Sequence, residues 1–209
     1  NLPINHPGFL IVLEGIDGTG KSTQAQLLTE SLRQQGFKVI HSREPTDGPH
    51  GRKLRESASS GRLSAEQELD LFHKDRHEHV ETTIRPALKD GHIVVLDRYY
   101  FSTMAYQGIR GFDPQEIRRT NEEFAPRPDL LLLLELSVDA AMNRIGARDG
   151  QGNQFEQKES LQLCRAIFHS VKDDFLEVIE ADQPVEQIHD AIMRTVNPAL
   201  TSLRARRAQ

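Results

Sequence analysis

Residues 15–22, Gly-Ile-Asp-Gly-Thr-Gly-Lys-Ser, constrain the chain more than any other segment. They fit the pattern G-x-x-x-x-G-K-S and lie between an apolar run at 9–14 and a stretch of helical spacing that starts at Lys21. Such a loop lets backbone N–H groups approach a triphosphate, because a Cβ atom at its glycines would obstruct the turn or the ligand. The following helix adds free N–H groups and the positive end of its dipole. The segment therefore predicts a phosphate-binding loop (P-loop) for a nucleoside triphosphate.

The polar side chains of this loop have separate expected roles. Lys21 supplies a mobile positive charge, and the Ser22 hydroxyl can ligate Mg²⁺. Asp97 ends another apolar run and is expected beside Ser22, where it would hold the metal through a bound water. An aspartate that caps the next helix is the alternative interpretation of Asp97. The predicted ATP-binding residues are Gly15, Gly18, Thr19, Gly20, Lys21, Ser22 and Thr23.

The distribution of apolar residues predicts an α/β fold. Five short runs rich in leucine or β-branched residues indicate strands at 9–14, 37–41, 92–97, 130–136 and 175–179. They are nearly continuous in apolar residues, as parallel strands covered on both faces are. Amphipathic helical spacing follows at 21–35, 66–88 and 184–196. We expect a three-layer sandwich with a five-stranded parallel sheet, of the P-loop NTPase type, as one domain over residues 1–209.

Composition excludes several other classes of protein. The longest apolar runs, 9–13 and 130–134, are far shorter than the roughly 20 residues of a membrane-spanning helix. The net charge of -5 gives no global positive field for nucleic acid, so any anion site must be local. The single Cys164 cannot form an internal disulfide, and no signal-peptide pattern is seen at the start. We expect a cytoplasmic protein without nucleic-acid or membrane partners.

The arginines favour a kinase over a switch. The chain has no N-K-x-D, and Asp97 is followed by Arg-Tyr-Tyr without the glycine of a GTPase. Phosphoryl transfer between two anions needs positive charge on both sides of the moving group. Arg43 and Arg98 follow predicted strands, while Arg144 and Arg148 are spaced i, i+4 on one helix face beside the turn-rich segment 148–153. We therefore predict a short mobile lid near 144–156, and a flexible tail at 203–209.

Five segments together resemble thymidylate kinase. They are G-I-D-G-T-G-K-S-T at 15–23, R-E-P at 43–45, L-F-H-K-D-R at 71–76, D-R-Y-Y-F-S-T-M-A-Y-Q at 97–107 and P-D-L-L-L-L-L at 128–134. Their order and spacing match from residue 9 to about 196. The fourth segment discriminates best, because other nucleoside monophosphate kinases share the P-loop but not this stretch. The resemblance implies transfer of the γ-phosphoryl group of ATP to dTMP with Mg²⁺, giving dTDP and ADP, by a homodimer.

The resemblance also implies an acceptor site. Asp17 would face the sugar 3′-hydroxyl and help to hold Mg²⁺. Phe72 would stack on thymine, and Arg76, one helical turn later, would hydrogen-bond a base oxygen. Tyr106 would close the sugar pocket against a ribose 2′-hydroxyl. The remaining acceptor residues are Arg43 and Arg98 at the phosphate, Ser102, Thr103 and Gln107 along the base, and Glu156 near the metal or the sugar.

Catalysis is expected to rest on positioning and charge. One variant of the family has an arginine in the P-loop where this chain has Thr19, so the lid must supply that charge here. The catalytic residues predicted are Lys21, Arg98, Arg148 and Arg144, and no general base is needed because the acceptor is an ionised phosphate. Plain surface charge is the alternative for the lid arginines. We interpret His73 and His77 as exposed helix residues rather than zinc ligands.

Two other functions stay open from the sequence. One is a kinase for another nucleoside monophosphate or for a deoxynucleoside, which a test of alternative acceptors would identify. The other is a nucleotide-binding switch, which would bind ATP or GTP without an acceptor.

Overall fold

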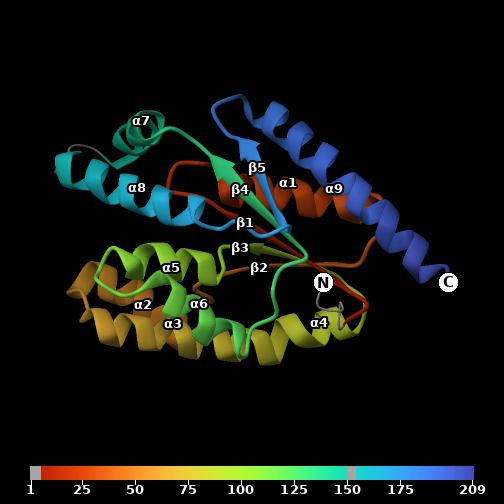
Figure 1. Cartoon of the computed structure of the whole chain (residues 1–209), viewed down its shortest axis with the longest axis horizontal. Helices are drawn as coiled ribbons and strands as arrows, with labels where there is room; N and C mark the ends of the chain where they lie inside the picture. The colour runs from red at the N-terminus through yellow and green to blue at the C-terminus, as the bar shows by residue number, and fades with distance from the viewer. Residues whose placement is uncertain (1–5, 150–153) are drawn as a thin grey trace.

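The structure of the chain is a computed structural model that describes residues 6–149 and 154–209, with side chains outside 147–156. A parallel sheet forms the middle layer, in the order β2-β3-β1-β4-β5 (Figure 1). Its strands are β1 (Phe9–Glu14), β2 (Val39–Arg43), β3 (Ile93–Asp97), β4 (Leu130–Glu135) and β5 (Leu176–Glu180). The predicted α/β sandwich with a five-stranded parallel sheet is confirmed.

Strand β2 begins two residues later than predicted. The N–H of Phe37 donates to Leu32 O, and Gly36 has a φ of 89°. Residues 36 and 37 therefore close the preceding helix instead of starting the strand. The strand also ends two residues later than predicted, at Arg43, whose partner in the parallel register is Asp97 of β3.

Helices cover both faces of the sheet. On one face lie α1 (Lys21–Gln34) and α9 (Val185–Arg207). On the other lie α5 (Tyr100–Gly108), α6 (Pro114–Glu122), α7 (Val138–Asp149) and α8 (Gln154–His169). α2 (Pro49–Ser60) packs against α3 (Ala65–His79), which is also on this side (Figure 1).

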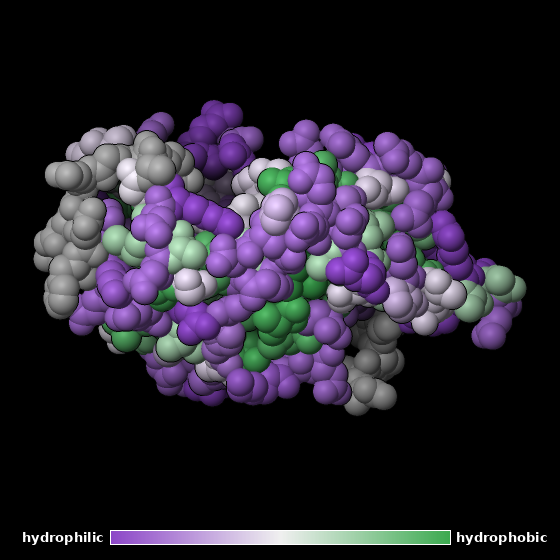
Figure 2. All heavy atoms as spheres, turned by 90° about the horizontal axis from the view of Figure 1, so that it is seen from above, coloured by the Kyte–Doolittle hydropathy of each residue, from purple (hydrophilic) through white to green (hydrophobic). Residues whose placement is uncertain are grey.

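Strand β1 explains why the predicted strands lack alternation. Leu10 and Val12 face the core on the α5 side, whereas Ile11 and Leu13 face the core on the α1 side. Both sets of side chains are fully buried. Polar side chains cover most of the face shown in Figure 2, as expected for an outer layer of amphipathic helices. Among the described residues, no helix combines the length and apolar character needed to cross a bilayer.

The helix predicted at 66–88 is divided into three elements. α3 is followed by the π-helical turn η1 (Val80–Ile84) and the short α4 (Arg85–Lys89). Pro86 has no N–H group and its ring conflicts with the preceding turn, which favours a wider turn before it. In η1 the N–H of Arg85 donates to Val80 O, five residues earlier.

The C-terminal segment differs from the prediction of a flexible tail at 203–209. α9 continues to Arg207, and Leu203 is only 3% exposed. Arg204 donates to Gln35 O at 3.2 Å and places its Cζ 4.5 Å from the centre of the Phe37 ring. Leu203 continues the buried stripe of α9, and Arg204 and Arg207 donate to backbone carbonyls, so residues 203–207 extend the helix.

Replacement of Leu203 tests this anchoring. We expect Leu203→Ala to lower the free energy of unfolding by about 2 kcal/mol, because it removes buried apolar surface near the end of the chain. The exposed neighbour provides the control, Ser202→Ala, which should change stability by less than about 0.5 kcal/mol. Urea unfolding measures both values. Equal stabilities of the two variants would contradict the packing of the tail.

Candidate active site

The P-loop joins the end of β1 to the start of α1. At Gly15, φ is 146° and an added Cβ would lie 2.7 Å from Leu134 O, so glycine is required there. Gly20 is the N-cap of α1 in a left-handed conformation. The Lys21 side chain turns back over the loop, where Nζ donates to Gly15 O and Ile16 O, each at 2.9 Å. The predicted strand-loop-helix setting of the motif is confirmed.

Lys21 is buried beneath the loop, and its charge is sensitive to this environment. Desolvation lowers the pKa of Lys21 to about 7, and the positive charge of Arg98 contributes, while nearby acids oppose the shift. A bound anion would raise this pKa again. Phosphate binding therefore favours the charged form of Lys21.

The Ser22 hydroxyl donates to Asp97 Oδ2 at 2.6 Å. This contact confirms the predicted neighbourhood of the two residues across α1 and β3. Asp97 is not the cap of α5, because Tyr99 occupies the N-cap position. Within residues 6–149 and 154–209, no cluster of three or more His, Cys, Asp or Glu side chains is placed to hold a metal. A hydroxyl and a carboxylate fit Mg²⁺, which usually completes its oxygen shell with phosphates and water.

Arg98 connects the P-loop with α5. Its Nη2 donates to Asp17 Oδ1 at 2.5 Å, and its Nη1 donates to Ser102 Oγ at 3.0 Å and to the Tyr106 hydroxyl at 3.3 Å. Its Cζ lies 5.3 Å from the centre of the Tyr106 ring. The backbone of Arg98 has a φ of 74°, unusual for a residue with a side chain. The structure thus brings together four of the predicted site residues.

Glu14 is a residue of this site that the sequence analysis missed. It ends β1, is fully buried, and accepts hydrogen bonds at Oε1 from Tyr99 N (2.7 Å) and Ser102 N (3.1 Å). Its Oε2 accepts the Ser102 hydroxyl at 2.6 Å. Burial raises the pKa of Glu14 to about 7, although Arg98 and these hydrogen bonds oppose the shift. The one charged residue of an otherwise apolar strand was the available signal.

A cavity of about 500 Å³ lies between the P-loop and the loop after β2. Its lining carries both positive and negative side chains. The cations are Lys21, Arg43, Arg55, Arg98 and Arg144, and the acids are Asp17, Glu44 and Asp97. Cations from the P-loop side and from the predicted acceptor side therefore share one space.

Arg55 is a second residue that the sequence analysis missed. It lies on α2 and donates to Pro45 O and to Asp47 Oδ1, each at 3.0 Å. Arg43, which is exposed, donates to the same Asp47 oxygen at 3.0 Å. No motif marks an arginine on a polar helix, so only the folded chain reveals that Arg55 faces the cavity.

Arg144 is held against the P-loop. Its Nη1 donates to Gly18 O and its Nη2 to Ala181 O, each at 2.9 Å. Arg144 is itself exposed, so its role at a phosphate stays a prediction. The side chains of Arg148 and Glu156, and the lid segment 150–153, lie outside the described residues.

The predicted base-binding residues lie on α3 and α5. Phe72 is half-buried one turn before Arg76, which is 2% exposed and donates to Thr103 Oγ1 at 3.0 Å. Gln107 is fully buried, and its Nε2 donates to Glu68 Oε1 at 2.8 Å. Within the described part of the chain, Gln107 Oε1 has no hydrogen-bond partner, so it is available to a ligand donor.

The two histidines of α3 are not both exposed as expected. His73 is half-buried and its Nε2 lies 3.1 Å from Asn121 Nδ2, while burial lowers the pKa of His73 to about 4. His77 is exposed and stacks on Phe124 with ring centres 3.6 Å apart. Their i, i+4 spacing serves packing against α6 and the segment after it.

Comparisons with known proteins agree on one family. A sequence model described as "Thymidylate kinase" matches residues 13–192. Thymidylate kinase of Akkermansia muciniphila is 49% identical over 190 residues, which cover 91% of this chain and 92% of the relative. Thymidylate kinase of Xanthomonas oryzae pv. oryzae is 46% identical over 198 residues, covering 93% and 87%. That of Xanthomonas campestris pv. campestris is 48% identical over 190 residues, covering 89% and 83%.

The buried Glu14 carboxyl predicts a pH dependence of stability. Folding raises its pKa from 4.5 to about 7, so the folded chain keeps a proton that the unfolded chain has lost. This contribution to stability is present below the unfolded pKa and is lost as the pH rises through the folded pKa. Relative to Glu14→Gln, which stays neutral, the protein that keeps Glu14 should lose on the order of 1–3 kcal/mol of unfolding free energy between about pH 5 and pH 8.

Urea unfolding of both proteins at the two pH values gives this difference. Both proteins carry Lys21→Met, because the pKa of Lys21 lies in the same range and depends on Glu14. The histidines and the other acids titrate in both proteins, so their effects cancel in the comparison. A difference that stays constant or grows with pH would contradict the raised pKa of Glu14.

Proposed function

The chain belongs to the thymidylate kinase family, and on this premise we propose that it transfers the γ-phosphoryl group of ATP to dTMP, giving dTDP and ADP. The observation that carries the proposal is that cations of the P-loop and of the proposed acceptor side line one shared cavity. Two nucleotides whose phosphates approach one another repel strongly. A shared cationic space offsets that repulsion and favours phosphoryl transfer.

On the donor side, the P-loop amides and Lys21 hold the triphosphate. Thr19, Gly20 and Thr23 belong to the loop and the first turn of α1, where N–H groups face a bound phosphate. Arg144 is placed to act on the same phosphates, since it already contacts Gly18. Arg148 stays a prediction as the second lid arginine.

Mg²⁺ accompanies ATP in this proposal. Ser22 and Asp97 would hold it, with Asp17 as a further carboxylate on the P-loop. When bound, the ion neutralises charge on the phosphates. The hydroxyl and carboxylate donors fit this hard cation, and a shell completed by phosphates fits the small number of protein ligands.

On the acceptor side, Arg98, Arg43 and Arg55 bind the phosphate of dTMP. Phe72 stacks on thymine, and Arg76 donates to a base oxygen. Ser102 contributes through its hydrogen bonds with Glu14 and Arg98. Thr103 contributes by accepting a hydrogen bond from Arg76. Gln107 offers its free oxygen to the base.

The sugar and the reacting groups complete the site. Asp17 faces the 3′-hydroxyl, Tyr106 excludes a 2′-hydroxyl, and Glu156 lies near the sugar or the metal. Lys21 and Arg98 hold the two phosphates on either side of the transfer, and the ionised acceptor needs no base. We propose that the enzyme acts as a homodimer in the cytoplasm.

Coupled ADP release tests the proposed activity. With ATP and Mg²⁺, dTMP should stimulate ADP formation far more than dUMP, UMP, dCMP or thymidine does. Lys21→Ala should lower turnover by at least about a hundredfold, because it removes a cation at the transferring group. Lys89→Ala, at an exposed lysine of α4, is the matched control and should retain full activity. Slow ADP formation that dTMP does not change would refute the kinase activity.

A further inference from the structure

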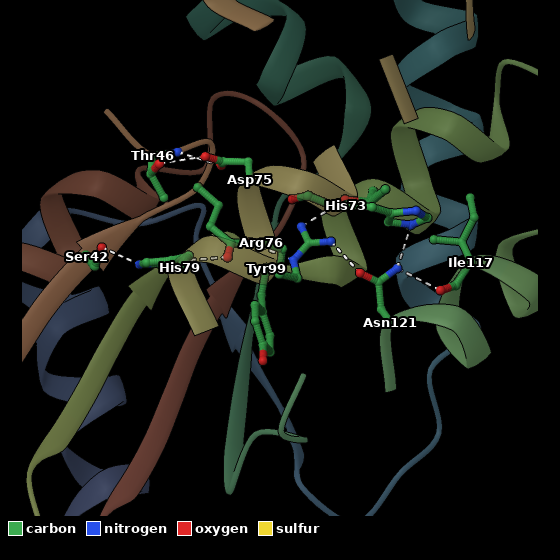
Figure 3. Close-up of polar contacts among 12 residues, drawn as sticks. Ser42, Thr46, His73, Asp75, Arg76, His79, Tyr99, Ile117 and Asn121 are labelled. Atoms are coloured by element: carbon green, nitrogen blue, oxygen red, sulfur yellow. Dashed lines mark hydrogen bonds and ion pairs between the residues drawn. The ribbon is translucent and has the colours of Figure 1, made fainter. Parts of the chain in front are cut away.

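Glu44, the residue directly after β2, is buried and its two carboxylate oxygens have different partners. Oε1 accepts a hydrogen bond from Arg76 Nε, and Oε2 from His79 Nδ1, each at 2.8 Å. The other ring nitrogen of His79, Nε2, lies 2.7 Å from Ser42 Oγ. Figure 3 shows this chain of contacts, which leads from Ser42 on β2 to the arginine proposed to bind the base.

The spacing of these residues explains how they meet. Ser42 and Glu44 are two positions apart and face the same side of the extended chain. Arg76 and His79 are three positions apart and share one face of α3. Two pairs of side chains, one from the β2 segment and one from α3, therefore lie opposite each other.

A second contact holds the loop after β2 in place. Asp75, on the neighbouring position of α3, accepts hydrogen bonds from Thr46 N at 2.8 Å and from Thr46 Oγ1 at 2.6 Å. Thr46 follows Glu44 in the chain and Ser42 precedes it, and Figure 3 shows Thr46 at Asp75 and Ser42 at His79. Glu44 is thus fixed against α3 from both directions.

The terminal nitrogens of Arg76 are also held. Nη1 donates to Asn121 Oδ1 at 2.7 Å, and Nη2 donates to Thr103 Oγ1 at 3.0 Å. Asn121 is itself oriented, because its Nδ2 donates to Ile117 O at 2.7 Å and contacts His73 Nε2 at 3.1 Å. The guanidinium group has more N–H donors than these contacts and Glu44 use, so some are left for a ligand.

His79 determines how Glu44 binds Arg76. Arginine and a carboxylate frequently pair through two parallel N–H···O bonds. Here His79 occupies the second oxygen, so Glu44 takes one N–H of Arg76 and leaves both terminal nitrogens to other partners. Burial favours a raised pKa for Glu44, but Arg76 and the His79 hydrogen bond lower it below its ordinary value, so Glu44 is ionised.

Loss of His79 would disturb this arrangement. Oε2 of Glu44 would become a buried carboxylate oxygen without its donor, which is costly. The nearest remedy is a second bond from Arg76 to the same carboxylate. That bond would rotate the guanidinium group away from Thr103 and from the base.

We infer that His79 is a positioning residue for base selection, which keeps Arg76 directed at a thymine oxygen by occupying Glu44 Oε2. The inference rests on the proposed function, in which Arg76 donates to the base. Thymine has an acceptor oxygen at position 4, where cytosine has an amino donor. The orientation of an arginine at this position therefore discriminates dTMP from dCMP.

Variants of His79 test the inference through the kinetic constants for dTMP, dCMP and ATP. His79→Leu removes both ring nitrogens, and we expect the KM for dTMP to rise about tenfold, the order of one hydrogen bond. The preference for dTMP over dCMP should narrow by about the same factor, with the KM for ATP unchanged. His79→Asn keeps a donor near the Nδ1 position and should restore most of both values. His77→Leu, at the exposed neighbour on α3, is the control and should change neither value.

A purely structural role predicts a different result. In that case His79→Leu would lower the thermal midpoint and leave the KM for dTMP and the dTMP-to-dCMP preference unchanged, which would overturn the inference. An Asn variant as impaired as the Leu variant would also overturn it. Should His79→Leu fail to fold, Ser42→Ala replaces it and should shift both values in the same direction by about twofold. Unchanged values in that variant would again overturn the role.

The wild-type enzyme separates the two levels of the proposal. Wild type that prefers dTMP, with variants that keep this preference, overturns the role of His79 alone. Wild type whose ADP release ignores dTMP overturns the proposed function and the role of His79 with it.

Discussion

The relative position of the P-loop and α5 depends on the contact between the Glu14 carboxyl group and the first turn of α5, with Arg98 beside it. β1 and β3 are neighbours in the sheet, so the ends of these strands place Glu14 and Asp97 at the same edge. Glu14 accepts hydrogen bonds from the N–H groups of Tyr99 and Ser102 and from the Ser102 hydroxyl. Arg98 then reaches the P-loop through Asp17. These contacts fix the P-loop and α5 relative to one another.

Electrostatic balance in the cavity follows from this arrangement. Burial lowers the pKa of Lys21, and the positive charge of Arg98 lowers it further. Glu14, Asp17 and Asp97 partly compensate the cations without bound phosphates. Bound phosphates can replace these acids as the negative charges next to Lys21 and Arg98. The site is therefore adapted to anions, although the chain as a whole carries a net charge of -5. Because the positive charge is concentrated in one cavity, the net charge of the chain does not reveal the anion site.

Much of the fold and part of the site could be predicted from sequence, because they depend on local patterns. The P-loop, the apolar strands and the pairing of Ser22 with Asp97 follow from motif and strand order. Glu44 and His79 are separated by 35 positions, and no periodicity marks such a contact. The continuation of α9 beyond residue 196 was not predicted because the arginines near its end obscured the apolar stripe of Val196, Leu200 and Leu203. The break of the long helix at Pro86 could have been foreseen.

A crystal structure with dTMP and a non-transferable ATP analogue tests most directly whether one cavity joins the two phosphates. We predict that the terminal phosphate of the analogue contacts Lys21, and that the phosphate of dTMP contacts Arg98 in the same space. Thymine should then lie between Phe72 and the Arg76 guanidinium group. A dTMP molecule bound elsewhere, with Arg98 still contacting only Asp17, Ser102 and Tyr106, would contradict the central claim.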